Sequence, residues 1–289
     1  MKNFSSVYIC KADLDTIVAG FLLLGDTTIP VTTVVDRAPE DVLCNPSILC
    51  LECGGSGRTA ESNFDHHDGN RSLPCAAEQA WNILGRPSQF TVLVQYTACM
   101  DTGCTPHDKP EDGVLSLSSL VSGMMLSVAT QKNRFLEGLR LLHLVVENDL
   151  RPENSMRLCS LDVRAATYAK AKEHCRQQLQ QAALARREWI FAGIRVQSLE
   201  TPFPGVHGLL HSLGADISIA GNGTRWSISV NPEYKGLLQT IRNLLEQQEE
   251  GWGGPVHGTI LGSPRSQPSR LNLQNLIDAI SVAVVTDTS

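Results

Sequence analysis

The first half of the chain alternates short apolar runs rich in β-branched residues with runs of helical spacing. The predicted elements are strands at 6–10, 31–35 and 47–52 and helices at 16–24 and 75–84. The segment 90–96 opens apolar and β-rich, but its period alone does not decide between strand and helix. This alternation is typical of a parallel sheet with crossover helices, so an α/β fold is expected.

The second half changes character twice. From 115 to about 187 the sequence is almost entirely helical, and 167–187 has the composition of a long amphipathic helix. The elements predicted beyond it are β-rich segments at 190–199 and 216–230, the latter broken by a turn at Asn222-Gly223, and helices at 237–247 and 273–284. Three regions follow: an α/β domain over 1–150, a helical connector over 151–187 and a smaller α/β domain over 188–289.

Composition narrows the class of protein. Hydrophobic residues make up 42% and charged residues 19%, an ordinary globular balance. The net charge of -6 argues against non-specific binding of duplex DNA, which needs a broad basic face. No apolar stretch approaches the ~20 residues that a bilayer requires, and the start of the chain lacks the pattern of a signal peptide. A cytoplasmic protein is expected.

Nine cysteines are scattered without a disulfide framework, so free thiols in a reducing compartment are expected. The pair Cys50 and Cys53 has the CxxC spacing of zinc and redox sites. A structural zinc site needs a second Cys or His pair at a related spacing, and none follows. The pair is therefore interpreted as small residues in and just after a buried strand.

Four polar features lie at the ends of predicted strands of the first half, where open α/β sheets place their ligands. They are Asp13-Leu14-Asp15, Glu52 before Gly54-Gly55, Asp65-His66-His67, and Asp101 before Thr102-Gly103. Each alone occurs often in surface turns. Together, the carboxylates and imidazoles offer the oxygen and nitrogen ligands that suit Mn or Zn.

In this order the four features resemble the signature of the DHH phosphoesterase superfamily. The family includes oligoribonucleases, single-strand exonucleases, cyclic-dinucleotide phosphodiesterases, exopolyphosphatase-like proteins and family II pyrophosphatases. The resemblance implies a metal site formed by Asp13, Asp15, Glu52, His66 and Asp101. It places His67 beside the metal, where that residue contacts substrate or orients a ligand. The implied cofactor is Mn or Mg, as one or two ions.

The resemblance extends to the C-terminal region. The run from Gly253 and Gly254 to His257 is similar to the GGGH motif of the associated DHHA1 domain, in which glycines let the backbone approach a phosphate. Arg265 follows and is suited to pair with a phosphate. These four residues are the expected substrate-binding set, and a cleft between the two domains is expected to bring His257 and Arg265 opposite the metal site.

Departures from the family pattern concern the first two motifs: Glu52 stands where the family has a bridging Asp, and Thr16 stands where a Gly usually follows the DxD pair. A His usually lies a few residues before the DxD pair, but here the stretch from Val7 to Lys11 contains no imidazole. Lys11 places a cation at the site and is taken as a catalytic candidate with His67. We therefore expect one strong metal position that uses Asp13, Glu52, His66 and Asp101, and a weak or empty position near Asp15.

The leading interpretation is a metal-dependent phosphoesterase for a short oligonucleotide, a cyclic nucleotide or a polyphosphate-like substrate. The alternative is a catalytically weakened protein that keeps the cleft and binds a nucleotide or phosphate. The expected partner is a small phosphorylated or short nucleotide substrate. Binding of duplex DNA or of a membrane is not expected, and whether the protein forms a homodimer is left open.

One further histidine pair carries metal-compatible spacing. His207 and His211 are four residues apart and share a helix face. Without a third ligand nearby, such a pair is more often part of a half-exposed face, which is the interpretation adopted.

Overall fold

The computed structural model describes residues 3–25, 31–67, 73–102, 115–254, 258–264 and 267–287. The chain divides into two compact units, Met1–Glu173 and His174–Ser289. The division falls inside the segment expected to connect two domains. Of the residues in these ranges, none belongs to a helix long and apolar enough to cross a bilayer.

Unit 1 is built on a parallel sheet, as expected for an α/β fold. Its strands are β1 (Ser6–Ile9), β2 (Val31–Val34), β3 (Ile48–Leu51) and β4 (Asn63–Phe64), in the order β2-β1-β3-β4. The first three agree with the sequence prediction to within one residue at each end. The two-residue strand β4 was not predicted, because so short a run has no measurable period.

The helices of unit 1 are α1 (Leu14–Leu24), α2 (Glu40–Leu43), α3 (Ala76–Ile83), α4 (Thr91–Thr102), α5 (Leu117–Ser127), α6 (Gln131–Glu147) and α7 (Leu158–Leu161). Helix α8 (Val163–Ala182) follows and runs into unit 2. The undecided segment 90–96 is helical, since it belongs to α4 and to the short turn before it.

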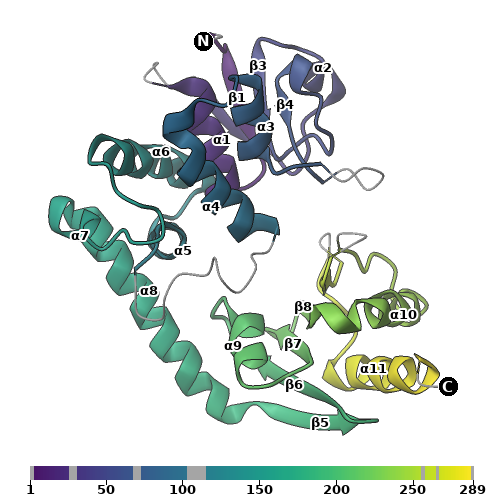
Figure 1. Ribbon diagram of the computed structural model, residues 1–289. Coiled ribbons are helices and arrows are strands. Elements are labelled where there is room, and N and C mark those ends of the chain that lie inside the picture. Colours follow the sequence, from purple (N-terminus) through teal and green to yellow (C-terminus); the bar gives the residue numbers. More distant parts are fainter. Residues whose placement is uncertain are drawn as a thin grey trace. The chain divides into compact units, whose positions relative to one another are not determined.

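Strand side chains of unit 1 alternate between two layers. Val7, Ile9, Leu49 and Leu51 are fully buried in the core that contains α1, α3 and α6 (Figure 1). Tyr8 and Cys50 point into a smaller cluster with Val42 and Leu43 of α2. Every residue of α1 is buried, which explains why this helix is apolar on all sides beyond Asp15 and Thr16 in its first turn.

Two glycines let α1 and α6 approach closely. A Cβ atom on Gly20 would lie 2.6 Å from the Phe135 ring, and one on Gly138 would lie 2.5 Å from Ile17. The close contact fixes the start of α1, which carries Asp13 and Asp15, against the core of unit 1.

Unit 2 contains a five-stranded mixed sheet. Its strands are β5 (Arg187–Phe191), β6 (Ile194–Glu200), β7 (Ile217–Gly221), β8 (Trp226–Val230) and β9 (Ile260–Gly262), in sequential order. Only the β6–β7 pair is parallel among these neighbours. The predicted turn at Asn222-Gly223 is confirmed, because Gly223 has φ +84° and β7 and β8 pair antiparallel on either side.

Helices cover both faces of this sheet. Helices α10 (Lys235–Glu246) and α11 (Leu273–Asp287) pack on Val196, Ile219 and Ile228 (Figure 1). Helix α9 (Val206–Ser212) packs with the end of α8 on the opposite face. This α/β arrangement confirms the predicted fold class of the second half.

The cysteines differ from expectation at one position. Cys50 and Cys53 are buried free thiols, as expected, and neither belongs to a group able to hold a metal within the described ranges. Cys99, in contrast, is disulfide-bonded, so the expectation of free thiols throughout the chain is wrong for this residue.

Candidate metal centre

The polar features of unit 1 meet beyond the carboxyl ends of its parallel strands. β1 leads to Lys11 and Asp13, β3 leads to Glu52, and β4 leads to Asp65 and the two histidines. Because parallel strands end at the same edge of a sheet, three separated motifs converge there. Glu52 has φ +56°, a left-handed conformation that is uncommon for a residue with a side chain and that marks a constrained turn.

Asp65 holds this edge together. Its Oδ2 accepts hydrogen bonds from the backbone N–H groups of Gly54 at 2.9 Å and Gly55 at 2.6 Å. Its Oδ1 accepts from the backbone N–H of His67 and contacts His67 Nδ1, both at 2.9 Å. Burial acts to raise the pKa of Asp65, but the hydrogen bonds from His67 and Gly55 outweigh it and lower that pKa. Asp65 is thus a positioning carboxylate.

Glu52 is buried without enough partners. Only 6% of its side chain is exposed, and its Oε1 has no hydrogen-bond partner. Its Oε2 lies 3.2 Å from His67 Nδ1 and 3.6 Å from His66 Nε2. Burial raises the pKa of Glu52 to about 8, against the opposing effect of His67. A buried carboxylate oxygen without a donor is costly unless a cation or proton satisfies it.

The two histidines have opposite electrostatic surroundings. Hydrogen bonds to Asp65 and Glu52 raise the pKa of His67 to about 10. Burial lowers the pKa of His66, although the nearby charge of Asp101 opposes this. His66 Nδ1 lies 3.3 Å from Asp101 Oδ2. His66 is therefore favoured in the neutral form that binds metals, whereas His67 is favoured as a cation in the metal-free protein.

Asp101 reaches the centre from a helix rather than from a strand end. It lies in the last turn of α4, so its predicted placement at the close of a strand is wrong. Helix α4 nevertheless brings the carboxylate to His66. Burial and the charge of Asp15 raise the pKa of Asp101 to about 6.

Asp15 has a structural role of its own. Its Oδ2 accepts from Ala76 N at 2.7 Å and its Oδ1 from Ala77 N at 2.8 Å, so the carboxylate satisfies two amides in the first turn of α3. Only 2% of Asp15 is exposed, and burial raises its pKa against the effect of these hydrogen bonds. The positive end of the α3 dipole favours a carboxylate at this position.

Asp13 lies beside the cluster. Its Oδ1 accepts from Thr16 N at 3.1 Å and caps α1, and its Oδ2 lies 3.6 Å from Lys11 Nζ. Its charge still acts on Asp15, His66 and Asp101. Lys11 is more than half exposed, so its ion pair with Asp13 contributes little to stability.

Two groups of side chains are compact enough to hold a cation. One consists of Glu52, His66 and His67, and the other of Asp15, His66 and Asp101; in each, the ligand atoms lie within 4.8 Å of one another. His66 belongs to both. The donors are carboxylate oxygens and imidazole nitrogens, and Glu52 Oε1 lacks a partner, so the residues fit a divalent metal.

This grouping differs from the expected division of ligands. Asp15, which we expected beside a weak or empty position, shares a group with His66 and Asp101. Asp13, expected at the strong position, belongs to neither group found in the described ranges. Of the five residues expected to form the metal site, the structure therefore places Asp15, Glu52, His66 and Asp101 in these two groups and Asp13 outside them.

The substrate-binding set expected in unit 2 is described only in part. His257 and Arg265 lie outside the described residues. Gly253 and Gly262 exchange two backbone hydrogen bonds, of 3.0 Å and 2.7 Å. A Cβ atom on Gly254 would collide with the Ile260 carbonyl oxygen. Close approach of this segment to β9 therefore explains Gly254 without a ligand, whereas a Cβ atom on Gly253 would meet open space.

Comparison with known proteins rests on structure. Neither a family model nor a curated protein matches the sequence. A pGpG-specific phosphodiesterase, PggH from Vibrio cholerae, matches with a TM-score of 0.61 at 16% identity, over 98% of this chain and 99% of that one. The DHH domain of a protein described as a member of a family of ribosomal proteins matches with a TM-score of 0.50 at 13% identity, over 98% of this chain and 87% of that one.

This chain has the DHH fold. Both likenesses extend over nearly the whole chain, so they include the second unit as well as the first.

Proposed function

We propose that this protein is a metal-dependent phosphodiesterase that hydrolyses a phosphodiester in a short nucleotide such as pGpG. The observation that carries the proposal is the sharing of His66 between two cation-sized groups of carboxylates and imidazoles. The likeness to a pGpG-specific phosphodiesterase supports the choice of substrate. Mn or Mg fits the oxygen-rich donor set better than a thiolate-binding ion.

The residues of the centre would have different roles in binding the cation and the substrate. Asp15, Glu52, His66 and Asp101 would hold the cation, which supplies Lewis acidity toward the phosphoryl oxygens and the attacking water. His67 is more than half exposed and is oriented by Asp65 and Glu52, so its ring can donate a hydrogen bond to a phosphoryl oxygen. Lys11, whose side chain is more than half exposed, adds a cation at the same edge.

A second candidate function is nucleotide binding without turnover. It is favoured by Asp15, because both of its oxygens already accept hydrogen bonds from α3. The residues ahead of Asp13 also contain no imidazole. In this case the centre would bind a cation and a phosphate, but would be too poorly supplied with ligands to drive hydrolysis.

The deciding experiment measures turnover of pGpG, a linear triphosphate and a generic phosphodiester by the full chain, with Mn, Mg or EDTA. We expect pGpG hydrolysis that rises with millimolar Mn, stops with EDTA and falls by roughly 100-fold or more in Asp101→Ala. Asp36→Ala is the matched control, since this carboxylate is exposed beyond β2. Binding of pGpG with no turnover in any metal would establish the second function instead, and full turnover in Asp101→Ala would remove the proposed centre.

A further inference from the structure

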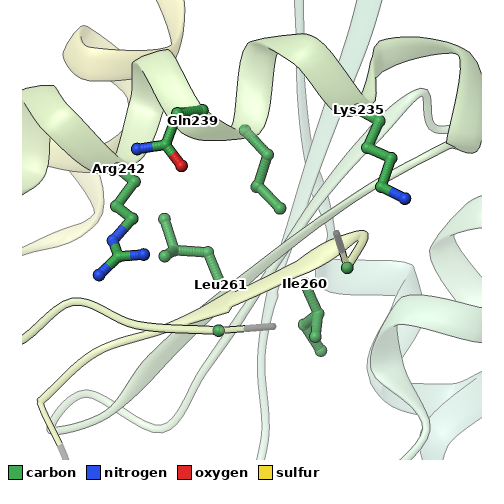
Figure 2. Close-up of a pocket in the computed structure, with 8 residues that line it drawn as sticks. Lys235, Gln239, Arg242, Ile260 and Leu261 are labelled. Atoms are coloured by element: carbon green, nitrogen blue, oxygen red, sulfur yellow. The ribbon is translucent and has the colours of Figure 1, made fainter. Parts of the chain in front are cut away.

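The two edges of the unit 2 sheet differ in how they are covered. At one edge, Gly253 lies outside β9 and exchanges two backbone hydrogen bonds with Gly262. Helix α10 also borders β9, and Lys235 and Arg242 of the helix line a small pocket with Ile260 of the strand (Figure 2). At the other edge, β5 pairs with β6 on its inner side, and within the described ranges no strand pairs with its outer side.

The turn after β5 decides which backbone groups of this strand point outward. The Ala192-Gly193 turn has φ +46° and +87°, which is a two-residue hairpin turn, so the closing pair of Phe191 and Ile194 is hydrogen-bonded. Hydrogen-bonded and non-hydrogen-bonded pairs alternate along an antiparallel ladder. The next pair, Ile190 and Arg195, is therefore not hydrogen-bonded across the two strands.

A contact on the far side of β6 supports this alternation. Arg195 N donates to Asp216 Oδ2 at 2.7 Å, and Arg195 O accepts from Asp216 N at 2.9 Å, so both backbone groups of Arg195 point away from β5. Its neighbour Ile190 consequently directs its own N–H and C=O to the outer side of β5, and so does Glu188, two residues earlier. These four backbone groups have no hydrogen-bond partner in the part of the chain that the structure describes.

Strand β5 carries none of the features that usually protect an open edge. Residues 187–191 include no Lys and no Pro, and their register with β6 runs without a bulge. Ile190 is 62% exposed, and it lies on the face opposite to the one on which Trp189 and Phe191 pack against the core. An open edge with an exposed apolar side chain is a surface on which another strand can pair.

The order of residues in β5 suits antiparallel pairing with a second copy of the same strand. Pairing centred on Trp189 places Glu188 opposite Ile190 of the second copy, so that outward groups meet outward groups and four hydrogen bonds form. The two Trp189 side chains then form a non-hydrogen-bonded pair, in which opposite side chains are closest. Arg187 lies opposite Phe191, where its guanidinium can rest against the aromatic ring.

Other registers are less favourable, and charge helps to exclude them. A shift by one residue sets outward backbone groups against inward ones. Pairing centred on Glu188 sets two carboxylates directly opposite each other, which is destabilising. Pairing centred on Ile190 moves Glu188 opposite the turn at Ala192 and so loses hydrogen bonds. The register centred on Trp189 therefore satisfies both the backbone and the charges.

We infer that the outer edge of β5 is a homodimer interface, at which two copies of unit 2 join their sheets by antiparallel pairing. The twofold axis passes at Trp189, so each copy contributes the same residues. Pairing over one short strand buries less area than a standard interface, so the dimer dissociates on dilution. The inference does not depend on hydrolysis at the centre of unit 1, because its residues all belong to unit 2.

The test measures both the extent of association and its location in the full chain. Sedimentation velocity over a wide range of protein concentrations should show a dimer fraction that rises with concentration. Hydrogen exchange followed by NMR should show that the amides of Glu188 and Ile190 become protected as the dimer forms. The amides of Trp189 and Phe191 already donate to β6, so their exchange should change little.

Three variants of one residue test the pairing and its register. Ile190→Pro removes an outward N–H from each copy and should weaken dimerisation by at least about tenfold, while the β5–β6 ladder, which does not use this N–H, is kept. Ile190→Glu should weaken it by roughly tenfold, since it sets a carboxylate opposite Glu188 of the second copy. Ile190→Lys should keep the dimer, because the lysine meets that carboxylate.

A control and a folding measurement accompany these variants. Val163→Glu changes another exposed apolar residue, in unit 1, and should dimerise like the unmodified protein. Thermal unfolding of each variant reports its folding, and the exposed position of Ile190 keeps Ile190→Glu and Ile190→Lys informative if Ile190→Pro is unstable.

Several results would overturn the inference. Sedimentation as a monomer at every concentration would leave the edge to an extended segment of a different protein. A dimer that is unchanged in Ile190→Glu, or protection that develops at other amides instead, would place the interface elsewhere. Equal weakening by Ile190→Glu and Ile190→Lys would contradict the register.

Discussion

Histidines occur in pairs in both units, and the surroundings of the two pairs are opposite. His66 and His67 lie among carboxylates, with Glu52 Oε1 left without a partner. His207 and His211 lie among serines, and every ring nitrogen has a partner: His207 contacts Ser218 and Ser227 at 2.7 Å and 2.8 Å, and His211 contacts Ala215 O at 2.8 Å and Ser229 Oγ at 3.2 Å.

The difference in hydrogen-bond satisfaction distinguishes a candidate reactive site in unit 1 from a structural network in unit 2. In unit 2 the imidazoles join α9 to the sheet and leave no nitrogen for a ligand, so the metal interpretation that we set aside for this pair fails on contacts. In unit 1 the polar groups are close but incompletely satisfied, which is unfavourable without a bound cation. Incomplete satisfaction of a buried cluster is thus a better guide to chemistry than spacing along a helix.

The largest expected effect concerns the residue shared by the two cation-sized groups. His66→Gln should reduce metal-dependent hydrolysis by roughly 100-fold or more, because it removes a donor from both groups at once. Steady-state rates with pGpG at several Mn concentrations measure this. His207→Gln is the control and should keep its hydrolytic rate; an equal loss in both variants would contradict the distinction between the pairs.

The second prediction uses the pH dependence of stability. Burial lowers the pKa of His207 to about 4, below its ordinary value of 6.5. The unfolded chain therefore binds the proton more readily, so stability present above pH 6.5 is lost as the pH falls toward 4. This one group should account for about 3 kcal/mol of the unfolding free energy. Urea unfolding of unit 2 at several pH values should show that loss in the unmodified protein, and a smaller one in His207→Gln.

The third prediction concerns the carboxylate with two roles. Asp15→Ala should lower the free energy of unfolding of unit 1 by about 2 kcal/mol, because two amides of α3 lose their acceptor. Asp13→Ala loses a single capping bond to Thr16, so about 1 kcal/mol is expected. Denaturant unfolding of both variants without metal makes the comparison. A larger loss in Asp13→Ala would show that Asp15 has no capping role.

The smallest effect is expected at Lys11. Lys11→Met should change the unfolding free energy by less than about 0.5 kcal/mol, because the pair with Asp13 is exposed. Calorimetric titration at low salt should show about two- to threefold tighter Mn binding in the variant, since a nearby cation is gone. Weaker binding would instead assign Lys11 a supporting role at the centre.

The sequence predicted the parts of the fold that depend on local pattern. Strands β1, β2 and β3 were recognisable from short apolar runs, and the motifs after them were expected at one sheet edge. Helix α4 was undecided, because the apolar residues at 92–96 fit either period. Because the period of this segment was undecided, the sequence did not predict that Asp101 lies on a helix rather than after a strand.

Other features of the site depend on tertiary contacts that have no local pattern. Asp65 accepts from the amides of Gly54 and Gly55, eleven and ten residues earlier, and Asp15 accepts from amides more than sixty residues later. The division of ligands into two groups follows from these contacts, so spacing could not predict it. The pocket beside α10 also required the structure, because it forms only when β9 lies next to the helix.

The start of α3 has a consequence for how metal loading could be followed. The amides of Ala76 and Ala77 donate hydrogen bonds to the Asp15 carboxylate, which also borders the candidate ion site. Anything that draws on the same oxygens weakens those two bonds, and the first turn of the helix then opens more readily. The rate of hydrogen–deuterium exchange at these two amides should therefore report whether a cation is bound at the centre, and it can be measured without substrate.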